Sequence, residues 1–326
     1  MAKVRLADIA KVAGVSAVTV HNAITGQKGV SDEMRARILE IAKEMGYRQP
    51  GSGARNTQGK SLRCIGVVIP ERYLAEYTTF YWKMYQEMAL AATEKSCMVT
   101  VEILKQEMED EMIVPCIAKE QTVDASRDYI HYLKKNVDLP IVFLDFYDNE
   151  LAKDAVIADN FHGMYLMTEY LYEHGLTKLA FVGSIHFSSS IMDRYCGFSK
   201  AVLEHRDVTP AEWILEDRDE RGQIEIHLPE QMPEAFVCNC DLTAGLLMLE
   251  LEKRGISVPE DVSVVGFDNY LYPGFPDLKI TSYEINTKAM VKVALEKALK
   301  QIRGAASGKN MEIVSGQLVP KESVKL

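Results

Sequence analysis

Residues 6–24 read LADIAKVAGVSAVTVHNAI, and this stretch decides how the chain begins to fold. Apolar side chains recur at helical spacing on both sides of Gly14, which interrupts the pattern. Ser16 is a residue type that caps helices, and Thr19 lies in the first turn after it. Two short helices joined by a tight turn that contains glycine make a helix-turn-helix.

The second of these helices combines an apolar face with an exposed one. Val20, Ala23 and Ile24 recur at the spacing of a buried helix face. The opposite face has the geometry to enter a major groove and meet base edges, although His21 on that face could also be an ordinary surface residue. We expect DNA to be read by four residues of this face: Ala17, Val18, His21 and Asn22.

A third helix completes a small DNA-binding domain over residues 1–50. Ser31 is its expected cap, and Asp32 and Glu33 suit the positive end of the helix dipole. One apolar stripe follows along the helix, formed by Met34, Ile38, Ile41 and Met45. Three helices with such stripes predict a small bundle.

Charge is divided unevenly along the chain. The net charge of the whole chain is −10, which by itself argues against nucleic acid as a partner. Residues 1–63 hold eleven Lys and Arg against five acids, a net of +6, whereas the remainder holds 26 bases against 42 acids, a net of −16. This division fits a basic N-terminal domain that binds the phosphates of DNA and an acidic body that these phosphates repel.

Residues 51–63 are expected to be a hinge or linker. With the three residues before them they read RQPGSGARNTQGKSLR, which contains a proline, three glycines and four bases but no acid. This segment has too few apolar residues for a core of its own, and its charge suits a path along DNA.

Residues 64–326 show alternating strands and helices, which predicts an α/β fold of mainly parallel sheets with helices on both faces. There are too many strands for one compact sheet. We therefore expect two lobes, an N-lobe at about 64–160 and 286–315 and a C-lobe at about 161–285 and 316–326. Strands are expected at 64–70, 98–104, 139–145, 179–184, 235–240 and 262–267, and helices at 80–95, 124–136, 161–174, 194–205, 241–255 and 288–304.

Charged residues follow several of the predicted strands, where ligands bind in folds of this class. Asp145, Asp241 and Asp268 come directly after strands, and Arg194 is expected in the turn after the strand at 179–184. We expect these side chains to line a cleft, although they could also be solvated loop charges. The acidic run at 216–220, with Glu216, Asp217, Asp219 and Glu220, is expected to be a solvated loop.

Other classes of protein are disfavoured by the pattern. There is neither an apolar run of 18 residues nor a charged-then-apolar signal segment, so we expect no membrane span and a cytoplasmic location. The six scattered cysteines are expected to be free thiols in or near the core. No serine-hydrolase, zinc-peptidase or P-loop motif occurs, so we expect no catalytic residue, no cofactor and no metal site.

Several stretches together resemble the lactose-repressor (LacI/GalR) family of bacterial transcription regulators. They are residues 6–24, GVSDEMRARILEIAKEMGY at 29–47, IGVVIP at 65–70, RYCGF at 194–198, VPEDVSVVGFDN at 258–269 and LVPKES at 318–323. The likeness runs in the same order over nearly the whole chain. It implies a repressor that binds a palindromic operator in double-stranded DNA as a homodimer, with a lobed, periplasmic-binding-protein-like body that binds a small effector, often a sugar.

The resemblance also implies site residues, position by position. For DNA it implies Ser16, Ala17, Val18, Thr19, His21, Asn22 and Ser31, with Arg55 and Thr57 in the hinge. For the effector it implies Phe80, Tyr81, Asp145, Arg194, Asp241 and Asp268. An arginine beside carboxylates can hold hydroxyl groups or a carboxylate, and aromatic rings can stack on an apolar sugar face, although Phe80 and Tyr81 could also be part of the core.

The chain departs from the family pattern at three informative positions. Asn22 stands where relatives often have arginine, Thr57 where the hinge usually has leucine, and Cys240 where asparagine is usual. These departures leave a second hypothesis open, a solute-binding protein whose head no longer binds DNA productively. An enzyme that uses only the lobes is a distant third.

Overall fold

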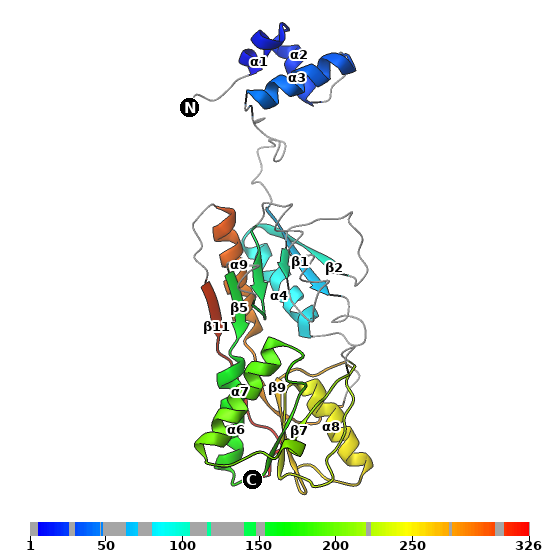
Figure 1. Ribbon diagram of the computed structural model, residues 1–326, viewed down its shortest axis with the longest axis vertical. Coiled ribbons are helices and arrows are strands. Elements are labelled where there is room, and N and C mark those ends of the chain that lie inside the picture. The colour runs from blue at the N-terminus through cyan, green and yellow to red at the C-terminus, as the bar shows by residue number, and fades with distance from the viewer. Residues whose placement is uncertain are drawn as a thin grey trace. The chain divides into compact units, whose positions relative to one another are not determined.

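The computed structural model describes residues 6–25, 30–45, 47, 63–70, 80–104, 116–118, 140–147, 154–219, 223–273, 276–303 and 310–325. The chain forms two compact units, residues 1–61 and 62–326 (Figure 1). The hinge residues Arg55 and Thr57 and the helix expected at 124–136 lie outside the described residues.

The first unit contains the expected three helices, α1 (Leu6–Ala13), α2 (Ala17–Thr25) and α3 (Asp32–Glu44). Gly14 has a φ of +70°, a left-handed conformation that glycine adopts without strain, and it allows the tight turn between α1 and α2. Ile9, Val20 and Ile38 are fully buried and form the centre of the bundle. The predicted helix-turn-helix is confirmed.

Serine side chains start α2 and α3 as expected. The Ser16 hydroxyl accepts a hydrogen bond from the backbone N–H of Thr19 at 3.1 Å. The Ser31 hydroxyl accepts one from the backbone N–H of Met34 at 3.4 Å. Each bond satisfies a donor that has no partner inside its own helix, which explains why the helices begin where they do.

The second unit contains two six-stranded sheets. In the first, the strand order is β11-β5-β4-β3-β1-β2 and all pairings are parallel. Its strands are β1 (Arg63–Pro70), β2 (Cys97–Leu104), β3 (Cys116–Ala118), β4 (Val142–Leu144), β5 (Asp154–Ala158) and β11 (Asn310–Val314). The helices α4 (Phe80–Glu94) and α9 (Thr287–Ile302) pack on this sheet and on each other.

The second sheet has the order β12-β10-β9-β8-β6-β7, and only β12 pairs antiparallel, with β10. Its strands are β6 (Leu179–Val182), β7 (Ile214–Leu215), β8 (Ala235–Cys238), β9 (Ser263–Asp268), β10 (Thr281–Glu284) and β12 (Gln317–Val319). It is accompanied by α6 (Asn160–Glu173), α7 (Ser189–Glu204) and α8 (Asp241–Lys253). The short turn η2 (Ala211–Trp213) precedes β7.

Helices cover both faces of this second sheet, as β8 illustrates. Val237 packs in a core cluster that includes residues of α6 and α7, while its neighbours Phe236 and Cys238 pack in a separate cluster with α8. Alternation along a strand sends successive side chains to opposite faces, so a strand buried on both faces reads as continuously apolar. The predicted α/β class with parallel sheets is confirmed.

Several details of the sequence prediction differ from the structure. The helix expected to begin at Arg194 begins at Ser189, because the Ser188 hydroxyl caps it by accepting the N–H of Ile191. The short strands β3, β5, β7, β10, β11 and β12 were not expected from the pattern. Five cysteines are free thiols, as expected, but the expected place in or near the core is wrong for Cys64 and Cys196, which are exposed.

Candidate effector site and DNA-reading face

The exposed face of α2 carries most of the residues expected to read DNA. Ala17, Val18 and His21 are exposed, and Asn22 is half-buried. Arg35 of α3 donates hydrogen bonds to the carbonyls of Asn22 and Ala23 at 3.1 and 2.9 Å. A cation at the C-terminal end of α2 satisfies carbonyls that the helix leaves without partners, and it ties α2 to α3.

Arg194 is the centre of the polar contacts at the carboxyl ends of the second sheet. The sequence placed it in a turn, but it lies inside α7, and it is buried because α7 packs against the strand ends. Its guanidinium donates from Nε to Oδ1 of Asn160 at 2.8 Å and from Nη1 to the carbonyl of Asn239 at 2.6 Å. Nη2 lies 3.3 Å from Oδ1 of Asp268, and the group stacks on Phe267 at 4.0 Å from the ring centroid.

Asp268 is the last residue of β9 and Asp145 follows β4 in the other sheet, and both have a positive φ. Their φ angles are +98° and +68°, and both residues are buried. Non-glycine residues rarely adopt such angles, and they persist where the surroundings hold them, often at binding sites. Ser190, in the first turn of α7, donates to the carbonyl of Asp145 at 3.4 Å and so brings the end of β4 close to the helix that carries Arg194.

Asp241 begins α8, and both of its carboxylate oxygens bind groups of the protein. Oδ1 accepts from the Ser282 hydroxyl at 2.7 Å, and Oδ2 accepts from the backbone N–H of Tyr270 at 2.8 Å. Gly266 leaves room for this carboxylate, because a Cβ there would lie 2.0 Å from Oδ1. Burial, together with the nearby charge of Asp268, raises the pKa of Asp241 to about 8.

The raised pKa predicts that replacing Asp241 changes how stability depends on pH. The folded protein holds a proton on Asp241 up to about pH 8, whereas the unfolded chain releases it above the ordinary pKa of 3.8. The contribution of this group to the free energy of unfolding is therefore complete below about pH 4 and falls as pH rises toward 8, by up to about 1.4 kcal/mol per pH unit. The difference in unfolding free energy between wild type and Asp241→Asn should fall across this range in urea titrations.

Asp277→Asn is the matched control for that measurement. Asp277 is an exposed carboxyl, and its pKa is lowered by a hydrogen bond from Lys279, so its pH dependence lies below about pH 4. Its difference from wild type should stay constant between pH 4 and 8. A constant difference for Asp241→Asn would contradict the protonated state.

Asp217 corrects the expectation of a solvated acidic loop, because it is fully buried. Oδ1 accepts from the Ser184 N–H at 2.8 Å and from Nε of Arg218 at 2.9 Å. Oδ2 accepts from Nη2 of Arg218 at 2.6 Å, from the Asn239 amide at 2.7 Å and from the Thr243 hydroxyl at 2.7 Å. Burial would raise the pKa of Asp217, but these hydrogen bonds and the charge of Arg218 outweigh it and lower the pKa to about 2.

The sequence contained a weak signal for Asp217. Like Asp145 and Asp268, it lies at or just past the end of a strand, two residues after the last residue of β7, Leu215. A strand of two residues is too short to be recognised from alternation, so the rule that selected the other two carboxylates could not be applied to it. Asn239 and Ser184 were missed for a different reason, since both lie within the segments expected to be strands.

The aromatic residues at the start of α4 belong largely to the core. Phe80 is buried and packs edge-on against Tyr81 and against Tyr270, which lies in the loop after β9, with ring centroids 5.4 and 6.1 Å apart. Tyr81 is half-buried. This contact across the two sheets brings α4 close to the loop that follows Asp268 and Asn269.

Comparison with known families supports the regulator hypothesis over the solute-binding one. Residues 5–49 match the family described as "Bacterial regulatory proteins, lacI family", and residues 168–324 match the "Periplasmic binding protein-like domain". Residues 5–49 are therefore a LacI-family DNA-binding domain. The protein is a DNA-binding regulator of transcription.

Curated relatives match this chain over almost their whole length. The HTH-type transcriptional repressors PurR of Aliivibrio salmonicida and Vibrio vulnificus are 25% and 26% identical to it, over 97% and 98% of this chain and 98% of each relative. Among solved structures, the lac repressor dimer bound to operator and the anti-inducer ONPF has a TM-score of 0.61 at 19% identity and covers 99% of both chains. A complex of the regulator CelR with cellobiose has a TM-score of 0.61 at 18% identity, over 98% of this chain and 100% of that one.

The arrangement of metal-ligating side chains and the length of the helices indicate whether the described residues could bind a metal ion or cross a membrane. Within the described ranges, no group of three or more His, Cys, Asp or Glu side chains is arranged to hold a metal ion. In the same part of the chain, no helix has the length and apolar character needed to cross a membrane.

Proposed function

We propose that this protein is a repressor that binds a palindromic operator as a homodimer and loses or gains operator affinity when a small, hydroxyl-rich effector such as a sugar binds. The relatives named above are repressors, one neighbouring structure is a dimer on its operator, and another holds cellobiose. Such a regulator works where bacterial DNA is, in the cytoplasm. Residues 1–50 would be its head, 51–63 its hinge, and 64–326 its effector and dimerisation part.

The observation that carries the effector proposal is the buried Arg194. A guanidinium has five N–H groups, and among the described residues three of them have partners, in Asn160, Asn239 and Asp268. The other two can donate to hydroxyl or carboxylate oxygens of a ligand, while Asp268 and Asp145 can accept from its hydroxyls. Phe80, Tyr81 and Asp241 complete the proposed set, with Asp241 acting through the neighbouring loop because its own oxygens already accept protein hydrogen bonds.

Sequence-specific DNA binding, and its response to an effector, can be tested on the DNA upstream of the protein's own gene. We expect a specific gel shift whose affinity falls steeply with salt, because lysines and arginines displace counterions from phosphates. A thermal-shift screen of sugars, nucleosides and sugar phosphates should identify the effector by a rise in melting temperature, and that compound should then change the gel shift. Equal shifts of specific and random DNA would instead favour a head that no longer reads sequence.

In the head, the residues proposed to contact DNA are Ser16, Ala17, Val18, Thr19, His21, Asn22 and Ser31, with Arg55 and Thr57 in the hinge. Asn22 is the one with an amide that can bind a base edge in two places, and asparagine prefers adenine. Asn22→Ala should weaken binding to the operator by about 1 to 3 kcal/mol and weaken binding to random DNA much less. Competition gel shifts at one salt concentration measure both affinities.

Lys11→Ala is the control for the head, because Lys11 is an exposed cation on α1. It should lower affinity for operator and random DNA by a similar factor, as a loss of phosphate attraction does. A similar uniform loss in Asn22→Ala would show that Asn22 does not read a base.

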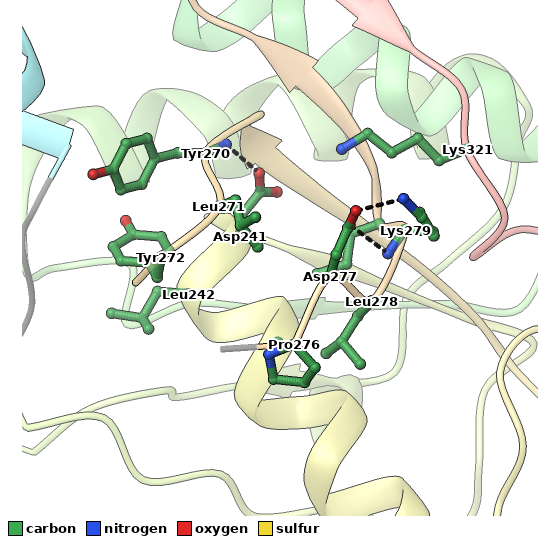
Figure 2. A pocket seen from close by; sticks show the side chains of 12 residues that line it. Asp241, Leu242, Tyr270, Leu271, Tyr272, Pro276, Asp277, Leu278, Lys279 and Lys321 are labelled. Atoms are coloured by element: carbon green, nitrogen blue, oxygen red, sulfur yellow. Dashed lines mark hydrogen bonds and ion pairs between the residues drawn. The ribbon is translucent and has the colours of Figure 1, made fainter. Parts of the chain in front are cut away.

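An exposed leucine beside α8 is a candidate contact for the proposed homodimer. Figure 2 shows a pocket lined by Leu242 of α8, Leu271, Pro276 and Leu278, together with the charged residues Asp241, Asp277, Lys279 and Lys321. Its volume is about 40 Å³, far below the roughly 300 to 1,000 Å³ of ligand pockets. Leu271 at its rim is 59% exposed, and exposed apolar patches often mark contacts with other proteins.

Leu271→Glu should therefore weaken self-association by at least about tenfold, because a charge would enter an apolar contact. Light scattering during size-exclusion chromatography over a range of concentrations measures the dimer. Leu203→Glu is the control, since Leu203 is 73% exposed but lies on α7, away from this pocket. If both variants remain dimeric, the dimer contact lies elsewhere.

A further inference from the structure

A strand-end cluster lies outside the set of residues proposed to bind the effector. It is formed by Ser184, Asp217, Arg218, Asn239 and Thr243. These residues follow β6, β7 and β8 or begin α8, so the parallel sheet brings three strand ends and one helix start to a single buried carboxylate. A buried charge that accepts several hydrogen bonds is costly to disturb and holds its partners in one arrangement. We propose that Asp217 is a positioning residue that sets the orientation of Arg194, acting through Asn239.

The first link joins Asp217 to Asn239. The Asn239 amide nitrogen lies 2.7 Å from Oδ2 of Asp217 and also donates to the carbonyl of Val182 at 3.0 Å. Gly183 packs closely against Asn239, because a Cβ at position 183 would lie 2.9 Å from the Asn239 Cβ. Only 2% of the surface of Asn239 is exposed, and its contact with Asp217 is the shortest of the hydrogen bonds that its amide donates.

The second link joins Asn239 to Arg194. The backbone carbonyl of Asn239 accepts from Nη1 of Arg194 at 2.6 Å, the shortest of the three polar contacts of this guanidinium. The direction of that carbonyl depends on how the Asn239 side chain is held, since both belong to one short segment between β8 and α8. The hydrogen bonds of the Asn239 side chain therefore fix the direction of the Asn239 carbonyl, and this carbonyl in turn fixes the orientation of the Arg194 guanidinium.

Arg218 explains why the carboxylate stays charged. Its guanidinium makes two hydrogen bonds to Asp217 and stacks on Phe187 at 4.9 Å from the ring centroid. A two-point ion pair has a fixed plane, so Asp217 cannot rotate toward one partner at the expense of the other. Residues that orient a binding group from behind often matter almost as much as the group itself.

The orientation of Arg194 matters for function because Arg194 is proposed to bind the effector, so this inference rests on the proposed function. The orientation itself can be measured without an effector. In the unliganded protein, the Nε–H of Arg194 should give a slowly exchanging, shifted NMR signal, because it is buried and donates to Asn160. Asp217→Asn keeps the shape of the side chain but removes its charge and one acceptor oxygen. We expect this variant to shift the Arg194 signal and to speed its hydrogen exchange at least tenfold.

Asn239→Ala is the second variant, since it keeps the backbone carbonyl and removes the amide that binds Asp217, together with its weaker bonds to the Val182 carbonyl and the Thr243 hydroxyl. It should change the Arg194 signal in the same direction, and the double variant should change it no more than the larger single change. If Asp217→Asn does not fold, the NMR signal of Asn239→Ala tests the proposal without it.

Ser323→Ala is the matched control. Ser323 is also buried and hydrogen-bonded in the same sheet, to Val264 and Thr281, but at the opposite end from Arg194. It should leave the Arg194 signal and its exchange unchanged. An unchanged signal in the folded Asp217 and Asn239 variants, or an equal change in Ser323→Ala, would overturn the proposal by showing that the cluster only stabilises the fold. Loss of the effector role of Arg194 alone would leave these NMR results intact.

Discussion

Replacing Asp217 with alanine is expected to lower the free energy of unfolding by about 3 to 5 kcal/mol, the usual cost of removing one partner of a buried ion pair. The variant would bury the Arg218 guanidinium without its carboxylate and would remove the acceptor of Ser184, Asn239 and Thr243. Urea unfolding followed by circular dichroism measures this change. Glu216→Ala is the control, because Glu216 is the exposed neighbour and should change stability by no more than about 0.5 kcal/mol.

The charge of Asp217 should also leave a signature at low pH. Its folded pKa of about 2 lies below the ordinary value of 3.8, so its contribution is complete above about pH 4. That contribution, about 2 kcal/mol from the size of the shift, should be lost as pH falls from 4 through 2. The stability difference between wild type and Asp217→Asn should shrink over this range, and a difference that stays constant would show that the carboxylate gains nothing from its charge.

Arg194→Ala is expected to abolish the response to effector while leaving operator binding intact. The loss of a buried, hydrogen-bonded charge commonly costs about 2 to 5 kcal/mol, which weakens effector affinity by about 30-fold to several thousand-fold. The head lies in the separate unit 1–61, so this substitution removes none of the residues proposed to contact DNA. Gel shifts with the effector found by the thermal-shift screen measure both properties.

Two variants control the Arg194 measurement. Arg254→Ala removes an exposed arginine that pairs with Glu250, and it should leave the response unchanged. Arg194→Lys keeps the charge but loses the planar fork, so it should retain only part of the response. If Arg194→Ala folds and responds like wild type, Arg194 is not in the effector site.

Local chemistry was sufficient to predict the head and the class of the body. The helix-turn-helix follows from apolar spacing, a left-handed glycine at position 14 and capping serines at 16 and 31, all of which act within a few residues. The parallel sheets follow from the alternation of strands with helices. Asp145 and Asp268 were found because the end of a strand is visible in the sequence.

Only the tertiary structure determines which residues of the strand-end cluster bind one another. Nothing in the run from Glu216 to Glu220 distinguishes a buried carboxylate from a solvated one, yet Asp217 is buried because the parallel sheet places β7 beside β6. Arg194 reaches Asn239, 45 residues away in sequence, because α7 packs where β8 ends. Local periodicity reports what each residue does within its own helix or strand, whereas the burial of a charge depends on partners that only the packed sheets bring together.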